Sequence, residues 1–501
     1  IVGDAQTSDE PSHHLSNLRG INYLRNEENP GFDGSCNRGA GEARGEYVVF
    51  LNNDTKVQKG WLDELIDTFD REPLAGLVGS RLVYPDGSLQ ESGGIIFNDG
   101  SGWNYGRDQD ADDPKYHFMR ESDYVSGACI ALRTDYFHEL GAFDERYAPA
   151  YYEDTDLAFR VRESGRKVFI QPQSAIVHYE GVTSGTDTSS GTKKYQVINQ
   201  KTFVERWKDA LESQPDPVED PFNGPAIRHA SQHRLKGRIL FIDATTPEPD
   251  KDSGSVRLTN LMQCFRDLGY GVTFFADNRE YAGSYTRNLQ RTGVEVLFNP
   301  WLNSLHEFFR KRGRDFDYIF VSRHYIAINY ISMIKRYCHH ARFIFDTVDL
   351  HYLREQRLAE LEQSKTLMRT SRLTRRSELR VIKAADATLV VSGVEKEVLK
   401  EDAPGEMVHI LSNIHQVPGR DKGFAERKDI YFVGGYQHPP NIDAACWFVN
   451  DIWPLIHEQL PDMRFHLIGS KAPERVQSLA GDGVVFHGFV ESLDPFLSDC
   501  R

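Results

Sequence analysis

The amino-acid sequence predicts an α/β protein whose second half contains Rossmann-like parallel sheets. Short runs of β-branched, aromatic and aliphatic residues recur along the chain, and segments with apolar residues three and four apart separate them. This alternation of strands and helices is typical of α/β sheets. Several apolar runs end abruptly at polar residues, and open α/β sheets bind ligands at the carboxyl ends of their strands. Functional residues are therefore expected at these strand ends.

Composition limits both the class of protein and the class of partner. The chain has 501 residues, which is enough for roughly two to four domains. It is 39% hydrophobic and 27% charged, and it shows neither a signal peptide nor the roughly 18 uninterrupted apolar residues of a membrane span. The net charge of −15 argues against a nucleic-acid partner, because clustered Lys and Arg bind phosphate backbones, whereas small nucleotides remain open.

The six cysteines lie far apart with no C-x-x-C pair, which indicates reduced thiols and a cytoplasmic protein. The chain starts at Ile1, inside a strand pattern that ends near Asp4, and it stops at Arg501 in mid-pattern. We therefore expect a piece of a longer protein, with the first strand of its first domain missing.

The most informative strand is Tyr47–Leu51, an uncharged apolar run expected to be buried on both faces of a sheet. Asn52, Asn53 and Asp54 follow it directly. A hard divalent cation that also binds phosphate needs only one or two protein carboxylates, so Asp54 is a candidate metal ligand. The alternative is that these polar residues form a turn and cap the helix predicted for Trp61–Phe69.

A second polar cluster places Glu153, Asp154 and Asp156 at the start of another predicted helix. Carboxylates at a helix start are favoured by the helix dipole, so simple capping is the alternative, but capping requires only one carboxylate. His178 ends a further predicted strand, where it could reach a metal or a phosphate. A lone histidine is more often structural, and that alternative also stays open.

The second half begins after a proline-rich linker predicted at residues 213–236. Strands and helices then alternate, and Leu353–Lys383 is predicted as one long helix. Its basic part, Arg369–Arg380, is either a contact with anionic lipid headgroups or a solvated face. A strand and a glycine turn start a further unit after residue 425, and neither a G-x-G-x-x-G nor a Walker A stretch occurs in it.

Several motifs occur in a fixed order over residues 1 to 205, namely Asn29–Phe32, Asn37–Gly39, Leu51–Thr55, Gly127–Ala128, Gly141–Glu145, Glu153–Leu157 and His178. Together they resemble the motifs of family 2 glycosyltransferases with the GT-A fold, in the bacterial rhamnosyltransferase-like group. The resemblance implies Mn or Mg held at Asp54 and His178, and a catalytic base at Asp154. Glu153 and Asp156 would support that base by raising its affinity for a proton. The implied nucleotide-sugar contacts are Asp4, Asn29, Gly31, Asn37, Asn53 and Gly127.

Three motifs of the second half, Asp252–Arg257, Phe345–His351 and His438–Asn441, are similar to those of GT-B glycosyltransferases of the family 4 type. The expected domains are a GT-A domain at 1–212, the linker at 213–236, a GT-B N-terminal Rossmann-like domain at 237–425 and an incomplete C-terminal one at 426–501. Because the donor-binding residues of that family lie farther along than Arg501, we expect the second half to transfer no sugar by itself.

The resemblances imply an inverting, metal-dependent glycosyltransferase of bacterial surface polysaccharide synthesis. The donor would be a dTDP- or UDP-sugar and the acceptor a saccharide or a lipid-linked saccharide. The expected location is the cytoplasm, with or without peripheral contact at the inner membrane face. Two alternatives stay open: a non-catalytic saccharide- or nucleotide-binding module on the same folds, and a nucleotidyltransferase, which would need a basic glycine-rich loop near the N-terminus.

Overall fold

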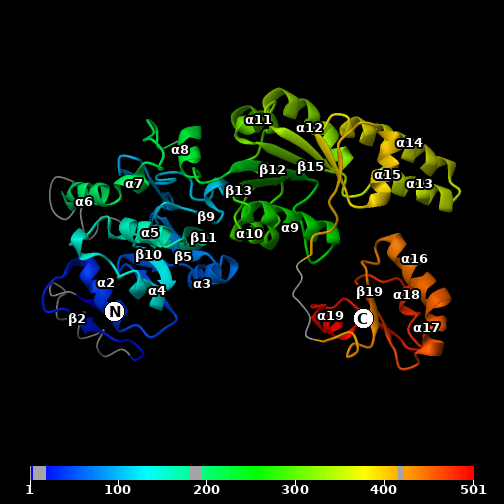
Figure 1. Ribbon diagram of the computed structural model, residues 1–501, viewed down its shortest axis with the longest axis horizontal. Coiled ribbons are helices and arrows are strands. Elements are labelled where there is room, and N and C mark those ends of the chain that lie inside the picture. The colour runs from blue at the N-terminus through cyan, green and yellow to red at the C-terminus, as the bar shows by residue number, and fades with distance from the viewer. Residues whose placement is uncertain (1, 4–18, 180–193, 223, 416–421) are drawn as a thin grey trace. The chain divides into compact units, whose positions relative to one another are not determined.

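The computed structural model describes residues 2–3, 19–179, 194–222, 224–415 and 422–501. Two compact units are present (Figure 1), one formed by Ile1–Thr246 with Leu261–Ser412 and the other by Pro247–Asn260 with Asn413–Arg501. The predicted contact residue Asp4 lies outside the described part of the chain. Within that part, no helix combines the length and the apolar character that crossing a membrane requires.

The first sheet of the larger unit is mixed. Its strand order is β3 (Tyr47–Leu51), β10 (Cys129–Arg133), β5 (Ala75–Val83), β11 (Lys167–His178) and β4 (Thr55–Val57), with β6 (Leu89–Glu91) beside β5 and β9 (Arg120–Glu121) beside β11. Strand β11 runs parallel to β5, whereas β10 runs antiparallel to both of its neighbours. The described ranges also contain two short strand pairs, β1 (Val2–Gly3) with β2 (Leu24–Arg25) and β7 (Gly94–Ile96) with β8 (Gly102–Asn104).

Helices surround this sheet, and the predicted helix after Asp54 is confirmed as α3. The elements are α2 (Gly31–Gly41), α3 (Trp61–Arg71), α4 (Thr134–Glu139), α5 (Glu153–Glu163), α6 (Lys194–Arg206), α7 (Lys208–Leu211), and the short turns η1 (Pro114–Tyr116) and η2 (Glu145–Tyr147). Leu65 and Phe69 of α3 are buried against the strands, because residues four apart share one helix face.

Strand β3 has the predicted bounds but not the predicted burial on both faces. Val48 and Phe50 are buried, whereas Leu51 is 43% exposed. The burial alternates along the strand because β3 ends the described strand order, where fewer elements cover a strand than at the centre of a sheet. An apolar run does not by itself reveal that position.

The segment expected as a linker, residues 213–236, contains the short helix α8 (Pro225–Ala230). Ile227 and Ala230 of this helix are buried in one apolar cluster with Leu89 and Ile95 of the first sheet region. Proline stands at the first position of the helix, where the missing N–H costs nothing.

The second sheet of the larger unit is parallel throughout, which confirms the predicted Rossmann-like architecture. Its order is β14 (Val294–Leu297), β13 (Tyr270–Ala276), β12 (Gly237–Asp243), β15 (Tyr318–Ser322), β16 (Arg342–Asp346), β17 (Ala387–Val390) and β18 (Val408–Ile410). Helices lie on both sides of it (Figure 1), as parallel sheets require. The connecting helices are α9 (Ser253–Asp267), α10 (Ser284–Arg291), α11 (Leu305–Arg312) with the turn η4 (Gly313–Asp315), α12 (His324–Tyr337) and α15 (Gly393–Asp402).

The prediction of one long helix at Leu353–Lys383 is wrong. Two helices occupy this stretch, α13 (His351–Leu361) and α14 (Lys365–Ile382). The break lies at Gln363, whose φ of +49° is left-handed. Ser364 then caps the second helix, because its hydroxyl accepts a hydrogen bond from the Leu367 N–H at 3.3 Å.

The smaller unit contains a three-stranded parallel sheet in the order β19 (Ile430–Val433), β20 (Phe465–Ile468) and β21 (Val484–Gly488). Its helices are α16 (Pro439–Trp447), the π-helical turn η5 (Phe448–Ile452), α17 (Trp453–Gln459), α18 (Glu474–Gln477) and α19 (Asp494–Asp499). Tyr436, Trp453 and Leu467 are buried in its core.

Candidate active site

Strand pairing brings the two predicted metal ligands together. Strand β4 runs antiparallel to β11, with Thr55 opposite His178. In this register His178 Nε2 lies 3.3 Å from Asp54 Oδ1. The Tyr179 N–H also donates to the Asp54 carbonyl oxygen at 2.9 Å, which holds the backbone of the two segments together.

The second ring nitrogen of His178 contacts Gln90, a buried residue that the sequence did not indicate. His178 Nδ1 lies 3.1 Å from Gln90 Oε1. Because an amide oxygen can only accept, Nδ1 donates this bond and Nε2 faces the Asp54 carboxylate. A partner that fixes one ring nitrogen while the other points at a ligand position is typical of metal-binding histidines.

The pair Asp54 and His178 fits a cation that shares its coordination with phosphate. Among the described residues, no group of three or more His, Cys, Asp or Glu side chains is arranged to hold a metal ion. Mg²⁺ typically binds through one or two carboxylates, several waters and the phosphates of the substrate, so a pair of protein ligands is sufficient.

The start of α5 orients Asp154. Tyr151 and Tyr152, which precede the helix, both have left-handed backbones, with φ of +76° and +73°. Such conformations are costly for bulky residues and cluster at functional sites. Asp154 Oδ2 accepts a hydrogen bond from the Gly127 N–H at 2.9 Å, and Oδ1 accepts one from the Thr155 N–H at 2.6 Å.

Two consecutive residues connect the predicted base with the predicted metal site. The Gly127 N–H binds Asp154. The carbonyl oxygen of the next residue, Ala128, accepts a hydrogen bond from the Asn52 N–H at 3.0 Å. Asn52 stands two positions before Asp54, so both polar clusters meet at the segment that leads into β10.

Asp33 is a further acidic residue of this region, and the sequence reasoning missed it. Its carboxylate is fully buried, and neither oxygen has a hydrogen-bond partner in the described part of the chain. Burial, and next the nearby Asp154, raise the pKa of Asp33 to about 7. The sequence contained one sign of this buried carboxyl, since Asp33 stands among the small and apolar residues that start α2.

The pKa values of the two neighbouring carboxyls are raised as well. Burial, followed by the charges of Asp154 and Asp33, raises the pKa of Glu153 well above its ordinary value. Burial is also the largest cause that raises the pKa of Asp154, while hydrogen bonds from Gly127 and Thr155 act against it. Pairs of carboxyls that share a site in this way keep protons at unusually high pH.

We expect Asp33→Asn to stabilise the protein at pH 8 by about 1 to 3 kcal/mol, because the buried carboxyl of the parent is ionised there without a hydrogen-bond partner, whereas an amide stays neutral. The folded state holds a proton on Asp33 that the unfolded chain releases, so the stability of the parent falls as the pH rises from about 4 toward 7. The variant lacks this loss. Thermal unfolding of the parent and the variant at pH 5 and pH 8 measures this difference in pH-dependent stability. The control is Asp63→Asn, which changes an exposed residue of α3. Equal pH dependence in parent and Asp33→Asn would contradict the assignment.

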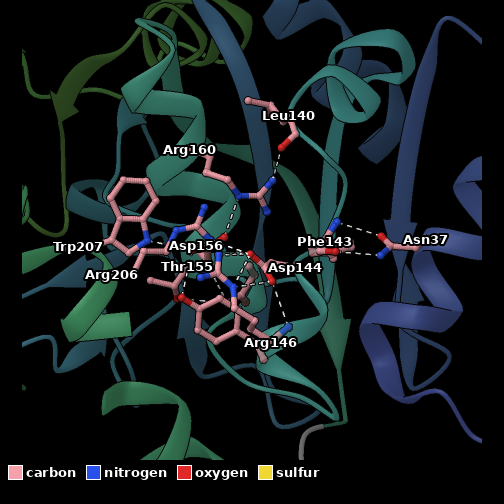
Figure 2. Close-up of polar contacts among 12 residues, drawn as sticks. Asn37, Leu140, Phe143, Asp144, Arg146, Thr155, Asp156, Arg160, Arg206 and Trp207 are labelled. Carbon is pink, nitrogen blue, oxygen red and sulfur yellow. Dashed lines mark hydrogen bonds and ion pairs between the residues drawn. The ribbon is translucent and has the colours of Figure 1, made fainter. Parts of the chain in front are cut away.

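The predicted nucleotide-sugar contacts differ in what their side chains touch. Asn37 donates to the Phe143 carbonyl and accepts from the Phe143 N–H, both at 2.9 Å (Figure 2), so it holds the loop before η2. Asn29 accepts from the Gly31 N–H at 2.9 Å. Gly31 has a φ of +79°, and a Cβ there would lie 2.8 Å from a backbone oxygen. Asn53 is exposed at the strand end.

Asp156 lies at the centre of a buried ion network (Figure 2). One carboxylate oxygen accepts from Arg160 Nε at 2.8 Å. The other accepts from Arg206 at 2.8 Å, from the Trp207 indole at 2.9 Å and from the Tyr147 hydroxyl at 3.1 Å. The network joins α5 to α6, and therefore fixes the helix whose first turn carries Asp154.

Comparisons with known proteins agree with the resemblance stated from the motifs. Residues 1–141 match glycosyl transferase family 2, and residues 427–501 match glycosyl transferases group 1. The O-antigen biosynthesis protein RfbC of Myxococcus xanthus is 34% identical over 157 residues, which cover 30% of this chain and 12% of that protein. The N-acetylglucosaminyl-diphospho-decaprenol L-rhamnosyltransferase of Mycobacterium tuberculosis is 26% identical over 215 residues, which cover 38% of this chain and 69% of that enzyme.

Among solved structures, GalNAc-T7 with UDP, GalNAc and Mn2+ aligns at 17% identity with a TM-score of 0.33, over 41% of this chain and 40% of that chain. The family assignment rests on the sequence matches. The chain accordingly carries a glycosyl transferase family 2 domain at residues 1–141 and a glycosyl transferases group 1 domain at residues 427–501.

Proposed function

We propose that the family 2 domain is an inverting, metal-dependent glycosyltransferase with Asp154 as its base. The observation that carries this proposal is the junction at Gly127 and Ala128, which binds Asp154 on one side and the backbone of Asn52 on the other. This junction supports the proposal because one short backbone segment contacts both Asp154 and the residue two positions before Asp54, and α/β proteins bind ligands at the ends of strands.

The proposed reaction is a single displacement at the anomeric carbon of a nucleotide sugar. The acceptor hydroxyl forms the new C–O bond while the bond to the donor diphosphate breaks, and Asp154 takes the hydroxyl proton. A raised pKa makes Asp154 a stronger base than an ordinary aspartate, provided that it is ionised when the acceptor binds. One displacement inverts the anomeric centre.

The proposed cofactor is Mn or Mg, held by Asp54 and His178. A divalent cation there would neutralise the charge of the departing diphosphate. We propose a dTDP- or UDP-sugar as the donor and a saccharide or lipid-linked saccharide as the acceptor, in bacterial surface polysaccharide synthesis. The two bacterial relatives, one an O-antigen biosynthesis protein and one a rhamnosyltransferase, support this class of substrate.

Hydrolysis of nucleotide sugars separates this proposal from a non-catalytic saccharide- or nucleotide-binding module. The enzyme should release nucleoside diphosphate slowly from a matching donor when manganese is present, because water can replace the acceptor hydroxyl. A panel of UDP-, dTDP- and GDP-sugars with manganese identifies the donor. Saturable binding with no release from any donor, with and without saccharide acceptors, would favour the binding module.

We expect Asp54→Ala to abolish the metal dependence of nucleotide binding. In the parent, the cation would share its coordination between Asp54 and the diphosphate, so manganese should tighten the binding of UDP or dTDP. Titration calorimetry with manganese and with EDTA measures the difference. Asp99→Ala, which changes an exposed aspartate in another loop, is the control and should keep the dependence. Equal binding by the parent in manganese and in EDTA would show that Asp54 is only a turn residue.

A further inference from the structure

Helix α14 carries a stripe of basic side chains along one face. The stripe consists of Lys365, Arg369, Arg372, Arg376, Arg380 and the C-cap residue Lys383. These positions follow one another at intervals of three and four residues, so they lie above each other over about five turns of an α-helix. All six residues are exposed.

The stripe faces away from the protein interior. The buried positions of α14, among them Ser371, Glu378 and Val381, lie on the opposite side of the helix, which packs on α12 and α13. Glu378 is the one acidic residue of the helix, and it is fully buried. The exposed face of α14 therefore presents positive charge without any acidic side chain of its own.

The stripe forms no ion pair with a neighbouring element in the part of the chain that the structure describes. Within the described ranges, none of its six members forms an ion pair or a side-chain hydrogen bond, whereas Arg375, one position away, pairs with Asp402. Repulsion among six aligned cations costs stability, because like charges four residues apart destabilise a helix. Such a cost is consistent with a binding role.

Apolar groups accompany the charges. Leu373, next to the stripe, is 58% exposed, and Leu361, the last residue of α13, is 77% exposed. A helix face with Lys and Arg beside exposed leucines suits the interface of a bilayer, where cations contact headgroups and apolar side chains enter the acyl boundary. A nucleic acid would make use of the charges but not of the leucines.

We propose that the basic stripe of α14 binds the surface of a membrane that contains anionic phospholipid. The chain has a net charge of −15 and would otherwise be repelled by such a surface. The stripe would thus favour membranes with anionic lipid, and it would orient the protein so that α14 faces the bilayer. This inference concerns the parallel-sheet region and does not depend on the transfer reaction proposed for the family 2 domain.

Co-sedimentation of the full chain with vesicles tests the inference. The parent should bind vesicles of phosphatidylcholine mixed with phosphatidylglycerol, should bind pure phosphatidylcholine far more weakly, and should lose binding as salt screens the charges. Replacing four members of the stripe by glutamine, Arg369, Arg372, Arg376 and Arg380, should weaken binding by roughly two to three orders of magnitude at low salt.

A matched control removes the same charge elsewhere in the parallel-sheet region. It replaces four exposed basic residues of α10, α11, η4 and α12 by glutamine, namely Arg287, Arg310, Arg314 and Lys335. This variant should bind the anionic vesicles within about threefold of the parent, since none of its four residues belongs to the exposed face of α14. Circular dichroism checks that both variants are folded.

Three results would overturn the inference. The first is failure of the parent to bind anionic vesicles at low salt. The second is equal binding by the stripe variant and the control variant, which would assign the attraction to general charge. The third is that duplex DNA binds the stripe and displaces the vesicles, which would make a nucleic acid its partner.

Discussion

Replacing Asp154 by asparagine should slow sugar transfer by about two to four orders of magnitude, the usual contribution of a general base. Asparagine keeps the shape of the side chain and can still accept the hydrogen bond that the Gly127 N–H donates to the carboxylate at 2.9 Å. Folding and donor binding should therefore change little. Initial rates with saturating donor and acceptor, together with donor affinity by calorimetry, measure the two effects separately.

The matched control for this change is Glu163→Gln. Glu163 is the last residue of the same helix α5, and it is exposed. Its replacement removes one carboxylate charge from the helix but none from the site, so transfer should continue at the parent rate. A rate for Asp154→Asn within a few fold of the control would remove Asp154 from the mechanism.

The pH profile gives a second measurement on Asp154. Because burial raises its pKa, the activity of the parent should fall on acidification at a higher pH than an ordinary aspartate would give. Only the ionised carboxylate can accept the hydroxyl proton, so this acid limb belongs to the base. The residual activity of Asp154→Asn should lack it.

Replacing Asp156 by asparagine should lower the free energy of unfolding of the N-terminal domain by about 3 to 5 kcal/mol. The change leaves Arg160 and Arg206 without the carboxylate that each now contacts at 2.8 Å, and Arg160 is buried. An uncompensated buried charge is costly because water no longer solvates it. At about 2 to 4 °C per kcal/mol, the midpoint of the thermal transition should fall by about 6 to 20 °C.

An exposed ion pair of the same domain provides the control. Glu46 pairs with Arg133, and the two side chains are 65% and 40% exposed. Replacing Glu46 by glutamine should cost no more than about 1 kcal/mol, because water and salt screen exposed pairs. Similar midpoints for Asp156→Asn and Glu46→Gln would show that the network around Asp156 contributes little to stability.

Local pattern in the sequence was sufficient for the elements around Asp54. Strand β3 has the predicted bounds and helix α3 follows where it was expected, since an apolar run and a helical spacing of apolar residues are local signals. The prediction of one long helix was wrong for a local reason too. It took account of the spacing of apolar residues but not of Ser364, which caps the start of α14. The family 2 resemblance likewise came from motifs that are contiguous in the chain.

The sequence alone therefore determined the α/β class, the family 2 motifs and the candidacy of Asp54, Asp154 and His178. Only the tertiary structure decided which side chains meet. His178 reaches Asp54 through the register of β11 on β4. Asp33 becomes a carboxyl with a raised pKa because α2 buries it near Asp154. Burial and pairing depend on residues distant in the chain, so no local pattern contains them.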